Sequence, residues 1–186
     1  MATLAKHLVT AEEFLGIEFD SEARFELDNG VIRMMAGGLA VHARLQTNVL
    51  AALFAKLRGT GCRPFGSDFA VKTHGLSIRY PDLTVYCGKD GPEFDRLKAF
   101  DDPKLIVEIL SDSTRRSDIE TKLPEYRNIP SLDAILYIDP DDETAHLEMR
   151  DPVRGWAVTV LERGGSLALP LNDITLSWDE IFSRAS

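Results

Sequence analysis

Residues 105–110 read Leu-Ile-Val-Glu-Ile-Leu, an apolar run in which Glu108 is the only polar residue. Such a run is typical of a central strand that is buried on both faces of a sheet. A carboxylate inside it is costly unless it is paired with a cation or binds a metal. The run therefore predicts a buried strand with either an ion pair or a metal ligand at its centre.

A second acidic residue, Asp82, occurs in a related setting. Tyr80-Pro81-Asp82 precedes the strand-like run at 83–86, and Asp82 lies 26 residues before Glu108. Because Pro81 cannot donate a hydrogen bond to a neighbouring strand, a strand is expected to start or bend there. The Asp82 carboxylate then points into a cleft, or accepts local backbone hydrogen bonds in a turn.

A lysine follows the two carboxylates. Lys122 lies four residues after Asp118, so the two could form an exposed ion pair worth only about 0.2–0.5 kcal/mol. Alternatively, its ammonium group lies beside a metal and offsets charge on a phosphate. Magnesium takes one or two carboxylates together with waters and phosphate oxygens. Asp82, Glu108 and Lys122 thus predict a metal-dependent phosphodiesterase site, provided that they converge.

The composition fits one domain spanning residues 1–186, with 44% hydrophobic and 27% charged residues. The amino terminus alternates apolar and polar residues, unlike a signal peptide. No apolar run approaches the roughly 20 residues that a membrane helix needs. Cys62 and Cys87 match no zinc spacing. We therefore expect a cytoplasmic protein with two free thiols and no membrane partner.

The net charge of −9 argues against a nucleic-acid partner, but the charge is unevenly distributed. Between Val31 and Pro81 there are seven basic residues and one acidic residue, so this segment carries +6. A basic face on an acidic protein is compatible with phosphate contact. The helix expected at 41–58 and Arg79 are candidates to contact a DNA backbone. The alternative is that these basic residues are ordinary surface residues.

Periodicity and turn signals predict a mixed α/β fold: one mixed sheet of about five or six strands flanked by helices, preceded by a helix and a β-hairpin. Asn29-Gly30 is the hairpin turn, and Thr10 with Glu13 caps the first helix. Pro124 predicts a kink or a later start in the third helix. The helices are expected at 10–20, 41–58, 117–128 and 178–182, the hairpin at 24–35, and the strands at 65–73, 77–87, 104–110, 134–139, 145–150 and 156–162.

These residues together resemble the Uma2 family of restriction-endonuclease-like proteins. The resemblance covers about residues 10 to 183 and is carried by Phe25–Gly30, His42, Pro81-Asp82, Val107–Ser111, Ser113–Arg115, Asp118, Lys122 and Tyr126. It implies a restriction-endonuclease-like core of the PD-(D/E)XK class, with a mixed sheet between helices.

The resemblance also implies roles for individual residues. Asp82 and Glu108 would bind Mg²⁺ or Mn²⁺ with the Ile109 carbonyl nearby, and Glu26 would be an accessory catalytic residue. The superfamily lysine would fall at position 110, which here is Leu110. The resemblance implies that Lys122, on the following helix, takes over the role of this lysine.

The expected activity is metal-assisted hydrolysis of DNA phosphodiester bonds by a homodimer. Two alternatives stay open from the sequence. One is a non-catalytic binding or assembly module built on a nuclease fold, since fold does not fix function. The other is a metal-dependent hydrolase of a small phosphoester, which the negative net charge would hinder less.

Overall fold

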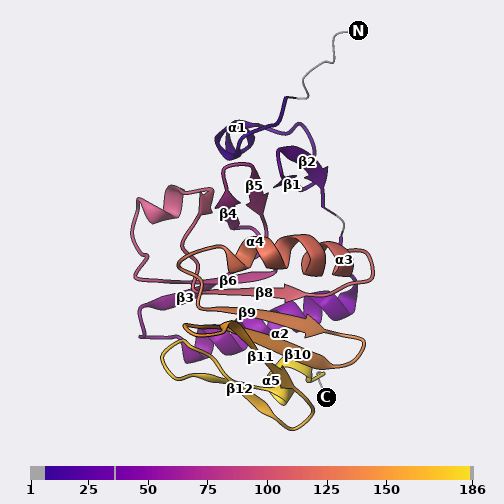
Figure 1. The fold of residues 1–186 in the computed structure, drawn as a ribbon, viewed down its shortest axis with the longest axis vertical. Helices are drawn as coiled ribbons and strands as arrows, with labels where there is room; N and C mark the ends of the chain where they lie inside the picture. Colours follow the sequence, from indigo (N-terminus) through magenta and orange to yellow (C-terminus); the bar gives the residue numbers. More distant parts are fainter. Residues whose placement is uncertain (1–6, 36, 185–186) are drawn as a thin grey trace.

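The computed structural model describes residues 7–35 and 37–184. Residues 1–6, on which part of the signal-peptide expectation rests, lie outside the described part. At the centre is a six-stranded sheet in the order β11-β10-β9-β8-β6-β3 (Figure 1). Only the β8–β9 pair within it is parallel, so the expected mixed sheet is confirmed. Its strands are β3 (Cys62–Gly66), β6 (Leu83–Cys87), β8 (Leu105–Ile109), β9 (Ala134–Asp139), β10 (Thr144–Asp151) and β11 (Gly155–Leu161).

Helices cover both faces of this sheet. On one face, α2 (Ala40–Lys56) and α5 (Trp178–Phe182) share one apolar core with the strands. On the other face, Leu123 and Tyr126 of α4 (Leu123–Arg127) pack on β8 and β9. A two-stranded ribbon of β12 (Ser166–Ala168) and β13 (Thr175–Ser177) leads into α5. No helix in the described part of the chain is long and apolar enough to cross a bilayer.

A second, five-stranded sheet was not expected from the sequence. Its order is β2-β1-β5-β4-β7, and it lies above the central sheet in Figure 1. The predicted hairpin forms its edge, with positive φ angles of 47° at Asn29 and 79° at Gly30. The predicted Thr10–Glu13 capping box begins α1. The elements of this region are α1 (Ala11–Gly16), β1 (Phe25–Asp28), β2 (Val31–Met34), β4 (Ala70–His74), β5 (Ser77–Arg79), η1 (Phe94–Arg96) and β7 (Ala99–Phe100).

The chain passes between the two sheets at the points where continuous strands were predicted. The predicted strand at 77–87 divides into β5 and β6, which belong to different sheets. The predicted strand at 65–73 likewise divides into β3 and β4. Tyr80-Pro81-Asp82 forms the first of these crossings, consistent with a proline that cannot continue a hydrogen-bonded ladder. Asp82 therefore lies where the chain enters the central sheet.

The predicted helix at 117–128 consists of three short pieces. It runs from α3 (Arg115–Ser117) through a π-helical segment, η2 (Asp118–Lys122), into α4. Pro124 lies in the first turn of α4, where a missing N–H is tolerated. The irregularity expected from Pro124 is thus the π-helical segment that precedes it. Such segments are frequent at functional sites, and this one contains Lys122.

The prediction of two free thiols is wrong. Cys62 on β3 lies directly opposite Cys87 on β6, and the two form a disulfide. Sequence spacing did not reveal this pair, because the cysteines become neighbours only when β3 and β6 align. The bridge closes a loop with a sequence separation of 25 residues at the edge of the central sheet.

Removing this disulfide is expected to lower the free energy of unfolding by about 2–4 kcal/mol, since the crosslink restricts the unfolded chain. The test compares the wild type with the double variant Cys62→Ser/Cys87→Ser in denaturant titrations with and without a reducing thiol. Reducing agent should shift the wild-type transition to that of the variant and leave the variant unchanged. A wild-type transition that ignores the reductant would contradict the prediction.

Candidate active site

Strand register brings Asp82 next to Glu108. In the antiparallel β6–β8 pair, Leu83 lies opposite Val107, so continuing the register by one residue places Asp82 beside Glu108. The Ile109 N–H donates a hydrogen bond of 2.7 Å to Asp82 Oδ2 and fixes this carboxylate against β8. The two acidic residues therefore meet at one end of these strands.

A cavity of about 440 Å³ opens at this point. Asp82, Glu108 and Lys122 all line it, together with side chains from α2 and from the loop that follows β8. The three residues singled out from the sequence are therefore brought together in one hollow. Their catalytic roles stay predictions.

Glu108 is almost completely buried, with 3% of its surface exposed. Its Oε1 atom accepts a hydrogen bond of 2.6 Å from the Tyr126 hydroxyl and lies 3.6 Å from Lys122 Nζ. Burial raises the pKa of Glu108 to about 8, and the charge of Asp82 acts in the same direction. The positive charge of Lys122 therefore does not fully offset the cost of burying the ionised Glu108 carboxylate. A bound metal cation would supply the missing positive charge.

Lys122 is not in the exposed ion pair that was one of the sequence alternatives. Its Nζ atom lies 2.9 Å from Asp118 Oδ1, and Asp118 is only 2% exposed. Burial opposes the charged lysine, but Glu108 and Asp118 more than offset this and raise the pKa of Lys122. A spacing of four residues separates Asp118, Lys122 and Tyr126, so the three side chains share one helix face. This spacing in the sequence could have revealed that they lie together around Glu108.

Two side chains of α2 hold Asp82 from the other side. His42 Nε2 lies 3.1 Å from Asp82 Oδ2, and the Gln46 side-chain amide donates a hydrogen bond of 2.9 Å to the Asp82 carbonyl oxygen. The hydrogen bond to Asp82 raises the pKa of His42, although partial burial opposes this. His42 was noticed in the sequence but was given no role there. The structure makes it a direct partner of Asp82.

Comparison with known proteins identifies the family of this chain. The sequence profile of the family described as "Uma2: Putative restriction endonuclease" matches residues 11–178. The chain belongs to the Uma2 family. Two relatives from Synechocystis sp. (strain ATCC 27184 / PCC 6803 / Kazusa) are named uncharacterized proteins sll1609 and slr1290. The first is 32% identical over 75% of this chain and 79% of its own length, and the second is 23% identical over 94% and 91%.

A solved structure from Anabaena variabilis ATCC 29413, described as a "putative nuclease belonging to DUF820", has a similar fold. It superposes with a TM-score of 0.76, covers 94% of this chain and 98% of its own, and shares 20% sequence identity. At this identity the likeness concerns the fold. The restriction-endonuclease-like architecture expected for this Uma2 protein is thereby confirmed.

The donor atoms of the cavity fit a hard divalent cation. Asp82 and Glu108 each use one carboxylate oxygen for the hydrogen bonds above, which leaves Asp82 Oδ1 and Glu108 Oε2 without a hydrogen bond in the described part of the chain. Magnesium typically takes one or two carboxylates and completes its shell with water and substrate oxygens. Across residues 7–35 and 37–184, no group of three or more His, Cys, Asp or Glu side chains could hold a metal. The two carboxylate oxygens without hydrogen bonds fit a cation that takes its other ligands from water or substrate.

Glu26, the predicted accessory residue, does not line this cavity. It lines a neighbouring hollow, to which Lys122 also contributes, and its Oε1 atom lies 3.1 Å from Arg79 Nη1. Its other oxygen, Oε2, is buried without a hydrogen-bond partner in the described chain. The structure thus places Glu26 in an ionic network with Arg79, at a hollow that Lys122 also lines.

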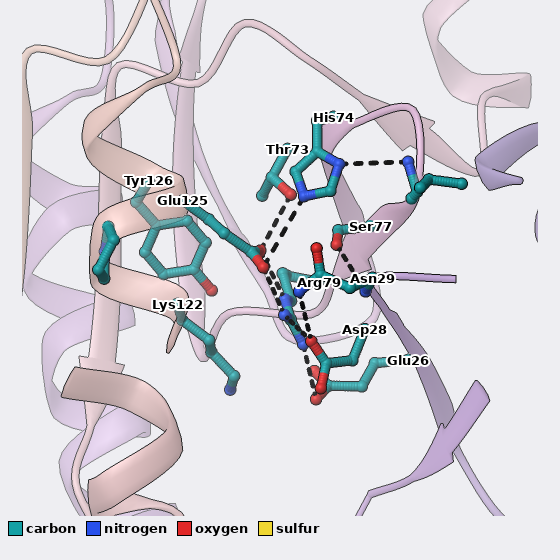
Figure 2. Close-up of polar contacts among 12 residues, drawn as sticks. Glu26, Asp28, Asn29, Thr73, His74, Ser77, Arg79, Lys122, Glu125 and Tyr126 are labelled. Atoms are coloured by element: carbon teal, nitrogen blue, oxygen red, sulfur yellow. Dashed lines mark hydrogen bonds and ion pairs between the residues drawn. The ribbon is translucent and has the colours of Figure 1, made fainter. Parts of the chain in front are cut away.

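Arg79 is the centre of this network (Figure 2). Its guanidinium donates two hydrogen bonds of 2.9 and 2.7 Å to the Glu125 carboxylate and one of 2.7 Å to Asp28. Arg79 lies three residues before Asp82, and Glu125 lies three residues after Lys122. The network therefore ties the strand that leads to Asp82 to the helix that follows Lys122.

The expectation that Arg79 contacts DNA is wrong, because its side chain is fully buried and bound to carboxylates. Two basic residues of α2 are also engaged within the chain. Arg44 donates to the carbonyl oxygens of Phe182 and Ser183, and Lys56 pairs with Glu180. These three basic residues were expected from the sequence to be available for contact with DNA. In the structure they instead bind groups of the protein itself, in the Arg79 network and on α5.

Proposed function

We propose that this protein is a metal-dependent endonuclease that hydrolyses DNA phosphodiester bonds. The observation that carries the proposal is the convergence of Asp82, Glu108 and Lys122 on one cavity, with two carboxylate oxygens left for a cation. Membership in the Uma2 family, whose description names a restriction endonuclease, supports the same reaction class.

Asp82 Oδ1 and Glu108 Oε2 are the atoms that would hold Mg²⁺ or Mn²⁺, and the Ile109 carbonyl is the predicted third protein ligand. When bound, the cation would polarise the phosphate and lower the pKa of a coordinated water. The hydrogen bonds from Ile109 N–H and His42 to Asp82, and from Tyr126 to Glu108, keep both carboxylates in place before substrate arrives.

Lys122 would stabilise the charge that develops on the phosphate. Its ammonium group lines the cavity and stays protonated, because the carboxylates of Glu108 and Asp118 raise its pKa. A preorganised cation in a buried site acts on developing charge without having to reorganise solvent. Ser111, Ser113 and Thr114 line the same cavity and carry hydroxyl groups that can donate hydrogen bonds to phosphate oxygens.

The purified protein is expected to nick or cut supercoiled plasmid DNA when Mg²⁺ or Mn²⁺ is added and to be inactive in EDTA. Gel electrophoresis of the plasmid measures this directly. A chromogenic phosphodiester assayed in parallel separates the alternatives. Hydrolysis of that compound without DNA cleavage would favour a small-phosphoester hydrolase, and cleavage that survives in EDTA would rule out the metal mechanism.

A further inference from the structure

A basic hollow lies at the end of α2 that is remote from the candidate active site, and we call it the distal hollow. It has a volume of about 510 Å³ and is lined by residues from the end of α2, from β3 and from the segment after β6. Among its lining residues Arg58, Arg63 and Lys89 are basic, and only Asp90 is acidic. On a protein with a net charge of −9, such a local excess of positive charge favours an anionic ligand.

The two arginines of the distal hollow are the positive charges of the basic segment 31–81 that the fold itself does not use. Both are exposed, and neither forms an ion pair within residues 7–35 and 37–184. The Arg58 guanidinium lies 5.8 Å from the centre of the Phe54 ring, which also lines the hollow. The other five basic residues of the segment bind groups of the protein, namely Arg33, Arg44, Lys56, Lys72 and Arg79. The charge that remains available is thus concentrated at one place.

The distal hollow and the active-site cavity open on the same side of α2, which runs along the central sheet (Figure 1). Ala43 lines the cavity and Phe54 lines the distal hollow, and both residues are exposed. The 11 positions between them correspond to about three helical turns and about 16 Å along the helix axis. No residue of α2 is acidic. A polyanion that occupies the cavity can therefore continue along α2 to the distal hollow without meeting a carboxylate of this helix.

We propose that the distal hollow binds backbone phosphates of the same DNA molecule whose scissile phosphate lies in the active-site cavity, with Arg58 and Arg63 as the contacts. The identity of this ligand rests on the proposed nuclease function. Phosphates of one DNA strand are about 3.4 Å apart along the helix axis, so the two sites are separated by about five nucleotides. The substrate is then a DNA that extends at least this far on one side of the cut. Contacts to phosphates position the DNA and carry no sequence preference.

DNA binding in the absence of divalent metal tests the distal hollow separately from cleavage. Fluorescence anisotropy of a labelled duplex measures the Kd at several KCl concentrations. Arg58→Gln and Arg63→Gln should each reduce the slope of log Kd against log salt concentration by about 0.9, because each removes one phosphate contact. The double variant should bind roughly tenfold more weakly at low salt. The double variant Arg58→Lys/Arg63→Lys should keep the wild-type slope, since lysine retains the charge.

Arg154→Gln is the matched control. Arg154 is also exposed and forms no ion pair in the described part of the chain, but it lies in the turn before β11, at the opposite edge of the central sheet from β3. This variant should bind DNA like the wild type. An equal loss in Arg154→Gln would show that net charge alone attracts DNA and would overturn the proposal, as would wild-type binding by the double variant Arg58→Gln/Arg63→Gln.

Cleavage kinetics separate docking from catalysis. The double variant Arg58→Gln/Arg63→Gln should raise the KM for DNA by roughly tenfold and leave kcat unchanged, because it removes binding that substrate and transition state share. A lower kcat with an unchanged KM would overturn the docking role. A wild type that binds DNA through Arg58 and Arg63 without cutting it would support the distal hollow and contradict the nuclease proposal.

Discussion

Glu108→Gln is expected to reduce metal-dependent DNA cleavage by roughly 10³-fold. A catalytic metal contributes several kcal/mol to the stabilisation of a transition state, and each 1.4 kcal/mol corresponds to about a factor of ten in rate. Glutamine keeps the size of the side chain and can still accept the hydrogen bond from Tyr126. It lacks the negative charge that the cation requires. Single-turnover cleavage at saturating Mn²⁺ measures the loss.

The same substitution should leave the fold intact. Burial and neighbouring carboxylates raise the pKa of Glu108 to about 8, so ionising this residue opposes folding of the metal-free protein. The neutral glutamine resembles the protonated form that burial favours. Lys122 loses one carboxylate partner but keeps Asp118 Oδ1 at 2.9 Å from its Nζ atom, so the melting temperature of the metal-free variant should stay close to that of the wild type. Lower activity caused by unfolding would instead appear as a lower melting temperature.

Glu148→Gln provides the matched control for this experiment. Glu148 is also a buried glutamate in the central sheet, but it pairs with Arg127 and does not line the cavity. Its replacement should leave the cleavage rate within about twofold of the wild type, because it contacts neither the candidate metal ligands nor Lys122. Equal losses in both variants would show that any buried glutamate is needed, and the metal-ligand role of Glu108 would be wrong.

The parts of this site that were predictable depend on local chemistry. Glu108 in an apolar run predicts a buried carboxylate that needs a partner, and Pro81 predicts an interrupted strand. Both expectations hold because they follow from the residues themselves. The helical spacing of Asp118, Lys122 and Tyr126 would have revealed the buried partners of Glu108 in the same way.

The parts that could not be predicted depend on which strands become neighbours. The disulfide exists because β3 aligns with β6. Arg79 resembled a surface residue because its partners lie 46 to 53 residues away in the chain. The second sheet was missed for a related reason. A proline occurs both where the chain crosses from one sheet to another and where a single strand bends. The local sequence pattern is the same in the two cases, so it does not distinguish them.

Arg79→Met is expected to lower the free energy of unfolding by about 3–5 kcal/mol, since removal of one partner leaves buried charges uncompensated. Glu26, Asp28 and Glu125 would lose their shared cation, and all three carboxylates are largely buried. A domain of this size is typically stable by only about 5–15 kcal/mol, so the loss is a large fraction of the total. Urea titration followed by circular dichroism measures it.

Arg33→Met is the matched control, because Arg33 also pairs with Asp28 but its side chain is 59% exposed. A surface pair of this kind contributes less than about 1 kcal/mol, so this variant should unfold close to the wild type. Arg79→Lys separates charge from geometry. Lysine keeps the positive charge but cannot form the paired hydrogen bonds to Glu125, and it should recover only part of the lost stability. Equal effects of Arg79→Met and Arg33→Met on the free energy of unfolding would contradict the prediction. They would show that burial does not strengthen the ion pairs of Arg79, and that Arg79 does not stabilise the connection between the Asp82 strand and the Lys122 helix.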